Sequence, residues 1–125
     1  MTIKVEYNKN NGIIEILLKE DFNWSVIEKI APQVSKIFLE TGCNRILLDF
    51  RKASITLSTV KIYMTPDKLN DEFQKYGVNV LNLRRALLLK KTDPDYHFLE
   101  TVVINKFHTF RTFYNEAEAR AWLKE

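Results

Sequence analysis

Apolar and polar residues alternate over Ile3–Tyr7, and an apolar-rich run resumes over Ile13–Lys19. Alternation with a period of two is typical of a strand that buries one face. Between the runs, Asn10, Asn11 and Gly12 tolerate positive φ, so a tight connection can form there. The pattern predicts a β-hairpin at the start of the domain.

A repeat of helical period follows the hairpin and places one apolar stripe on the sheet. Its members are Val26, Ile27, Ile30, Val34, Ile37 and Phe38. Asn23 or Ser25 can cap the start of this helix, and Gly42 stands where a helix commonly ends. Pro32 lies inside the stripe, which keeps its phase across the proline, so we expect one kinked helix rather than two short ones.

The next strand is predicted over Arg45–Phe50, and the run after it, Ser54–Met64, is ambiguous. Its apolar residues alternate as in a strand, but a longer stripe of helical period competes with that interpretation. The stripe consists of Thr59, Ile62, Pro66, Leu69, Phe73 and Tyr76. The longer match favours a helix from Ser58 to Tyr76, closed by Gly77, although Pro66 could instead open a separate, shorter helix.

The nearly continuous apolar run Arg85–Lys90 is typical of a central parallel strand with both faces covered. Asp93 and Pro94 then form a cap followed by a first-turn proline, which predicts another helix. The buried stripe expected for that helix consists of Phe98, Leu99, Val102 and Val103.

A short strand, Thr109–Tyr114, precedes the last predicted helix. Asn115 and Glu118 have the spacing of a capping box at its start. We expect Ala117, Ala121 and Trp122 to face inward.

The predicted order of elements is therefore ββαβαβαβα, an α/β fold with a mostly parallel sheet and an antiparallel first strand. The chain has 125 residues, 46% of them hydrophobic, and contains neither an internal repeat nor a linker. We expect one globular domain over residues 1–125.

The charge pattern and the single cysteine indicate which partners and which cellular compartment to expect. The net charge is only +3, with acidic and basic residues interleaved, so we expect no nucleic-acid partner. Arg84-Arg85 and Lys90-Lys91 are interpreted as solvated strand-end charges, with an anion site as the alternative. Neither a signal peptide nor an apolar run long enough for a membrane span is apparent, and Cys43 stands alone, so we expect a cytoplasmic protein.

The chemistry-bearing residues gather just after the predicted strand Arg45–Phe50. Asp49 and Arg51 follow its apolar core, and a hydroxyl-rich loop leads into the next helix. Partners and ligands of open α/β sheets meet the chain beyond the carboxyl ends of strands, so we place the candidate binding site there. Its predicted residues are Asp49, Arg51, Ser54, Thr56, Ser58 and Thr59. The simpler interpretations are that Ser58 only caps a helix and that Asp49 and Arg51 only pair with neighbours near the sheet rim. The alternative is that Arg51 receives an anionic group near the helix start at Ser58.

Four segments resemble, in order, the bacterial SpoIIAA-like (STAS/SEC14-like) family of small proteins. They read ILLDFRKASITLSTVKIY, RRALLL, DYHFLETVVINK and FRTFYNEAEARAWL. The resemblance covers roughly residues 13 to 124, and its motifs are mostly hydrophobic.

The resemblance implies a STAS-type fold and a non-enzymatic regulatory or protein-binding module. STAS relatives antagonise anti-sigma factors, and a hydroxyl in their Asp-Ser-Ser-Gly turn is phosphorylated. Alignment on Asp49 brings Leu57, Ser58, Thr59 and Val60 to that turn, where the hydroxyls match but the acidic residue and the glycine do not. The SEC14-like side of the family implies the alternative, a carrier or sensor of a small apolar ligand.

For that alternative we expect a cavity lined by Ile62, Tyr63, Pro66 and Leu69, beneath a helix that Pro66 bends. We expect a protein without enzymatic activity, metal or cofactor, and a weak hydrolase-like activity is the third alternative, kept only because cysteine and histidine are present. Cys43 has only the sequence-distant His97 and His108 as bases, and Asp93 and Asp95 are explained as a helix start. The hairpin strand Ile3–Tyr7 leaves a sheet edge protected only by Lys4 and Glu6, so we expect a homodimer.

Overall fold

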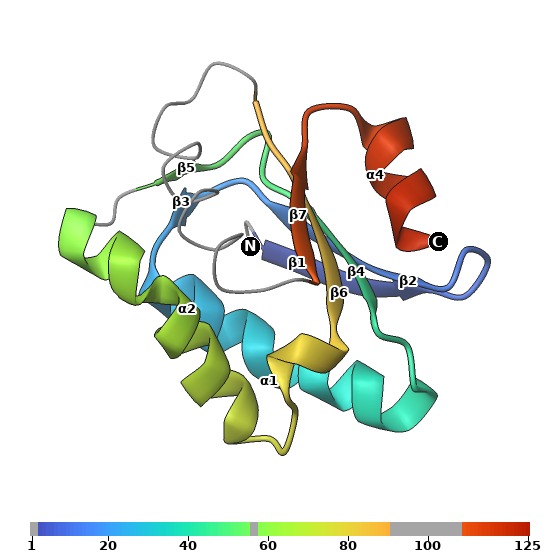
Figure 1. Ribbon diagram of the computed structural model, residues 1–125, viewed down its shortest axis with the longest axis horizontal. Coiled ribbons are helices and arrows are strands. Elements are labelled where there is room, and N and C mark those ends of the chain that lie inside the picture. The colour runs from blue at the N-terminus through green and yellow to red at the C-terminus, as the bar shows by residue number, and fades with distance from the viewer. Residues whose placement is uncertain (1–2, 56–57, 91–108) are drawn as a thin grey trace.

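The computed structural model describes residues 3–55, 58–90 and 109–125, which build a layered α/β fold around one mixed sheet (Figure 1). The strand order is β1-β2-β4-β6-β7. β1 is antiparallel to β2, and the remaining neighbours are parallel. The strands are β1 (Ile3–Asn8), β2 (Ile13–Leu18), β4 (Arg45–Asp49), β6 (Arg84–Leu88) and β7 (Phe110–Phe113). The predicted α/β class and antiparallel first strand are confirmed, whereas the predicted helix at Asp93 lies outside the described residues.

Helix α1 (Trp24–Thr41) begins and ends where the sequence predicts. The side chain of Asn23 accepts the backbone N–H of Ser25 at 2.9 Å. At the other end Gly42 adopts φ 74°, and its N–H donates to the carbonyl of Phe38 at 2.8 Å. The helix runs through Pro32 without interruption, because a proline removes one backbone bond while the apolar stripe still holds both halves on the sheet.

Helix α2 (Thr59–Gln74) is likewise continuous and contains Pro66. The alternative of a separate helix opened by Pro66 is therefore wrong. Gly77 follows in the left-handed conformation, with φ 75°, and leads to the short 3₁₀ helix η1 (Val80–Asn82).

A second, two-stranded sheet was not predicted. In it β3 (Asp21–Phe22) pairs in parallel with β5 (Ser54–Ile55). The ambiguous run Ser54–Met64 thus begins as a strand and continues as a helix. The hydroxyl of Ser54 donates to the carboxylate of Asp21 and links the two strands.

The sheet is covered on both faces (Figure 1). Helices α1 and α2 lie on one face, where Ile14, Ile16 and Ile46 belong to the larger core. Helix α4 (Glu116–Leu123) covers part of the other face, packing against Leu47 and Leu88.

The predicted inward face of α4 is wrong for Ala117 and Ala121, whereas Trp122 packs against the smaller core. Ala117 and Ala121 are exposed and Trp122 is partly buried, whereas Ala119 and Leu123 are completely buried. Both stripes have the same helical spacing. The observed one buries leucine, which removes far more apolar surface from water than a second alanine does.

The interpretation of Arg84 and Arg85 as solvated charges is also wrong. Arg84 stacks on the ring of Trp122, 3.9 Å from its centroid, and donates to the backbone carbonyl of that residue at 2.7 Å. Arg85 is only 4% exposed, and burial lowers its pKa to about 10. None of the described helices is long and apolar enough to cross a membrane.

Candidate functional site

Two charged residues of the predicted site, Asp49 and Arg51, bond to each other at the carboxyl end of β4. The side chain of Arg51 donates to both carboxylate oxygens of Asp49, from Nε at 3.0 Å and from Nη2 at 2.8 Å. The backbone N–H of Arg51 adds a bond at 3.2 Å. Two side chains two residues apart at the end of a strand can share a face, which makes this bidentate geometry possible.

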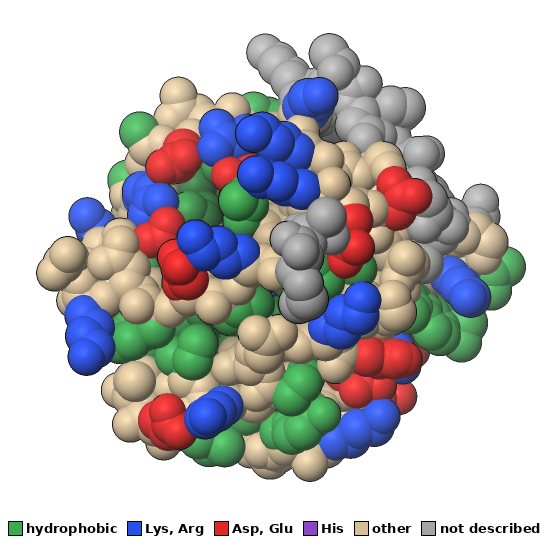
Figure 2. All heavy atoms as spheres, turned by 180° about the vertical axis from the view of Figure 1, so that it is seen from behind, with side chains coloured by type: hydrophobic (Ala, Val, Ile, Leu, Met, Phe, Trp, Pro, Cys, Tyr) green, Lys and Arg blue, Asp and Glu red, His purple; other side chains and the backbone are tan. Residues whose placement is uncertain are grey.

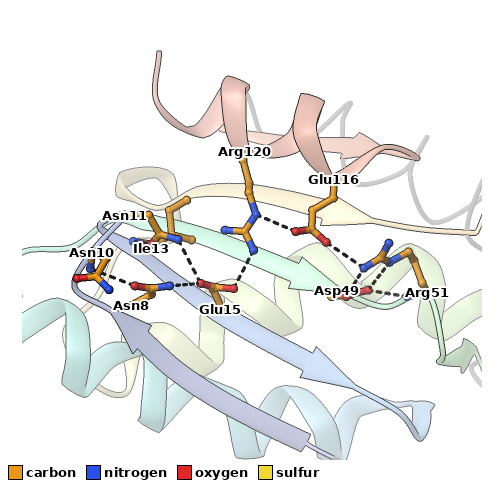
Figure 3. A network of polar contacts seen from close by, with 9 residues as sticks. All are labelled: Asn8, Asn10, Asn11, Ile13, Glu15, Asp49, Arg51, Glu116 and Arg120. Carbon is orange, nitrogen blue, oxygen red and sulfur yellow. Dashed lines mark hydrogen bonds and ion pairs between the residues drawn. The ribbon is translucent and has the colours of Figure 1, made fainter.

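This pair continues into a network that connects two strands of the sheet to α4 (Figure 3). Arg51 also donates to Glu116 at the start of α4, at 3.1 Å. Arg120, one turn later, donates to Glu116 at 3.0 Å and to Glu15 of β2 at 2.9 Å. The alternating charges therefore link β2, β4 and α4 on the face opposite α1 and α2.

Within this network the pKa values of two carboxyl groups, Glu15 and Asp49, are lowered. The hydrogen bond from Arg120 is the largest influence on Glu15, and it holds the pKa of that carboxyl below its ordinary value. For Asp49 the largest single influence is burial, which raises the pKa. The hydrogen bonds from Arg51 outweigh burial, so that the pKa of Asp49 is lowered. The acidic and basic side chains of this network form ion pairs with one another, which is typical of a structural role.

Ser54 and Ser58, the two predicted hydroxyl residues whose side chains are described, bond to groups outside this network. Ser58 is exposed, and its Oγ accepts the backbone N–H of Lys61 at 3.3 Å, as an N-cap of α2. The bonds of Arg51 go to Asp49 and Glu116 instead, so the structure does not pair Arg51 with Ser58. Thr56 lies outside the described residues, as does the side chain of Thr59.

Two apolar side chains beside Ser58 were missed by sequence reasoning. Val60 is 66% exposed and Met64 is 48% exposed. They are four residues apart on α2, so they lie on the same side of the helix. The signal was present, because both residues are apolar yet fall outside the stripe predicted to be buried. Ser58, Val60, Lys61 and Met64 are called the α2-start surface below.

An apolar cavity of about 70 Å³ lies between the sheet, α1 and α2. Of the four residues predicted to line a cavity, Leu69 lines this one, together with Phe73 from the same helix. Pro66 is buried but does not line it. The side chains of Ile62 and Tyr63 lie outside the described part of the molecule. The remaining lining residues include Ile16, Ile30, Phe50, Arg85 and Phe110.

Cys43 is buried at the amino end of β4. Its thiol donates to the carbonyl of Gly12 at 3.2 Å, which accounts for its position. His97 and His108 fall outside the described residues. Among the residues that the structure describes, no group of histidine, cysteine and carboxylate side chains could hold a metal ion.

No protein-family model matches this chain, and a search of curated proteins finds no match.

Proposed function

We propose that the chain is a non-enzymatic protein-binding module of regulatory, STAS type, and that it binds its partner through the α2-start surface. The observation that carries the proposal is the exposure of Val60 and Met64 together on one side of α2. Exposed apolar side chains next to hydrogen-bonding groups are the kind of surface that protein partners cover. The resemblance to the SpoIIAA-like family supports the same class of function.

The size of the surface suggests a weak, regulated interaction. Fully burying a side chain such as valine or methionine contributes roughly 1.5–3 kcal/mol. Burial of these two side chains alone would therefore give a binding free energy similar to that of a complex with a Kd of about 1 mM, which is about 4 kcal/mol. Any tighter binding must come from polar contacts around them.

Ser58 is a residue at which phosphorylation could regulate binding. It is exposed at the start of α2, a helix of 16 residues whose positive dipole end favours an anion. A phosphoryl group on this hydroxyl would add negative charge next to Val60 and Lys61 and thereby alter the surface that the partner contacts.

Capture of binding proteins from a cell extract tests the proposed surface. The bait pair is wild type and Val60→Glu/Met64→Glu. The matched control is Leu39→Glu/Leu81→Glu, which places the same charge on apolar residues that are 63% and 47% exposed elsewhere. We expect a protein retained by wild type and by the control but lost with the α2 variant. Equal retention by all three baits, or no retained protein at all, would contradict the proposal.

With a captured partner, Ser58 is tested separately. Ser58→Asp keeps a helix cap but adds a charge, whereas Ser58→Ala removes the cap without adding charge. We expect Ser58→Asp to change the affinity at least severalfold while the helix stays folded. Affinity equal to that of wild type would reduce Ser58 to a cap and leave Val60 and Met64 as the binding residues.

The apolar cavity favours the second candidate function, a carrier or sensor of a small apolar molecule. Its volume of about 70 Å³ is well below the roughly 300–1,000 Å³ of drug-sized ligand pockets, so only a very small molecule fits. Native mass spectrometry of gently purified protein is the test. A retained small mass that disappears in Leu69→Trp supports this function, and protein of unmodified mass counts against it.

A further inference from the structure

β1 is an edge strand. It stands at the end of the strand order, and no described strand lies beyond it. An edge strand presents a row of backbone N–H and C=O groups that can pair with another strand. The two charged side chains on β1, Lys4 and Glu6, are 66% and 61% exposed and bond to each other at 3.1 Å. Acidic and basic groups are interleaved on the face of the molecule seen in Figure 2.

The sequence of β1 is complementary to itself. When two copies of Ile3–Tyr7 run antiparallel with Val5 opposite Val5, Lys4 of each copy stands opposite Glu6 of the other. Ile3 then stands opposite Tyr7. Opposite charges and an aromatic beside a β-branched residue are favourable cross-strand pairs. A two-fold axis through the centre makes each of these pairs twice.

The neighbouring registers are worse. A shift by one residue would turn the apolar side chains of one copy to the wrong face of the sheet. The next two registers that keep the faces matched set Lys4 opposite Lys4, or Glu6 opposite Glu6, and like charges directly opposite are unfavourable. The charge pattern therefore selects the register centred on Val5.

In the monomer, the carboxylate of Glu6 has a less favourable charge environment than it would have beside a second copy. Across the hairpin Glu6 stands opposite Glu15, a like charge. Glu15 has its own cation, Arg120 at 2.9 Å, whereas Glu6 relies on the exposed Lys4 of the same strand. Lys4 of a second copy would lie on the open side of Glu6 and supply a second cation.

We propose that two copies of this chain associate through their β1 strands, antiparallel and with Val5 at the two-fold axis, to give one sheet continuous across the dimer. The α2-start surface is not part of this proposed contact. A groove of about 220 Å³, lined by Lys4 and Glu6 of β1 and by Glu116 and Arg120 of α4, would then meet its symmetry copy along the joined edges.

Sedimentation velocity over low to high micromolar concentrations tests the register through charge reversal. Lys4→Glu sets acidic side chains opposite each other, and Glu6→Lys sets basic ones opposite each other. The double variant Lys4→Glu/Glu6→Lys restores opposite charges in the homodimer. An equimolar mixture of the two single variants restores them in a heterodimer. Lys29→Glu, an exposed site on α1, is the control for net charge.

We expect each single variant on β1 to weaken self-association by about tenfold, and the double variant and the mixture to recover it. Lys29→Glu should associate as wild type does. Circular dichroism confirms that every variant is folded, as expected for exposed positions. A wild type that stays monomeric at high micromolar concentration overturns the proposal. So does a mixture of the two single variants that fails to associate, or a loss for Lys29→Glu as large as that for Lys4→Glu.

Discussion

The ion pair between Arg120 and Glu15 couples α4 to the strand β2, and its contribution can be measured. Arg120→Met removes the guanidinium but keeps an apolar stem, and Glu15→Gln keeps an oxygen for the amides of Asn8 and Asn11, which donate at 2.9 and 3.3 Å. A double-mutant cycle of these two substitutions isolates their interaction, because the bond from Arg120 to Glu116 is lost on both sides of the cycle.

The structure sets the expected size of this interaction. Exposed ion pairs contribute roughly 0.2–1 kcal/mol, and hydrogen bonds to charged groups about 1.5–3 kcal/mol. The two side chains are 27% and 30% exposed and 2.9 Å apart, which places them between these cases. We expect a coupling free energy of about 1–2 kcal/mol at pH 7.

The pH dependence follows from the lowered pKa of Glu15. A carboxyl whose pKa is lower in the folded than in the unfolded state stabilises the fold above its unfolded pKa, and this stabilisation is lost as the pH falls through the folded pKa. The coupling should therefore be complete at neutral pH and decline below about pH 4.

Urea unfolding of the four proteins of the cycle, at pH 7 and at stepwise lower pH, measures the coupling directly. If the two single substitutions have additive effects on the free energy of unfolding at neutral pH, the proposed interaction between Arg120 and Glu15 is refuted. A coupling that persists after Glu15 is protonated would refute its electrostatic origin.

The remaining predictions concern packing and helix ends. Leu123→Ala should lower the free energy of unfolding by about 2–5 kcal/mol, because Leu123 is completely buried on the inner face of α4; a loss below about 1 kcal/mol in urea unfolding would contradict that anchoring role. Ser58→Ala should cost about 1 kcal/mol in thermal melts and Ser58→Asp much less, and equal costs would argue against a cap. Gly42→Ala should cost about 1–2 kcal/mol through its φ of 74° alone, since an added Cβ meets no atom within 4 Å; an unchanged melting temperature would contradict this.

Local chemistry determined the element boundaries that the sequence predicts well. Asn23, Ser58 and Asn115 each bond to a backbone N–H two or three residues further along, and Gly42 takes a conformation that costs other residues more. Both partners of each contact lie within a few residues of each other, so the local sequence is enough to predict it. For Asp49 and Arg51 the sequence predicted only ion pairs with neighbours near the sheet rim as the simpler interpretation, and the bonds between these two residues are of this local kind.

The candidate site was only partly predictable. Ser58 was predicted from its place before a helical stripe, but Val60 and Met64 were not recognised as exposed. Helix α2 has more apolar residues than one face can bury, and only its docking on the sheet and α1 decides which of them remain in water.

Tertiary structure alone decided the contacts between distant segments. Arg120 and Glu15 are 105 positions apart, and nothing near either residue indicates the other. Similarly, the burial of Arg85 and the choice of Ala119 and Leu123 as the inner face of α4 depend on how that helix and the strands meet. The sequence by itself determined where the elements begin and end, because caps and periodic stripes act locally. Which faces meet was decided by packing, because burying the larger apolar surface outweighs the small preferences that a short helix carries alone.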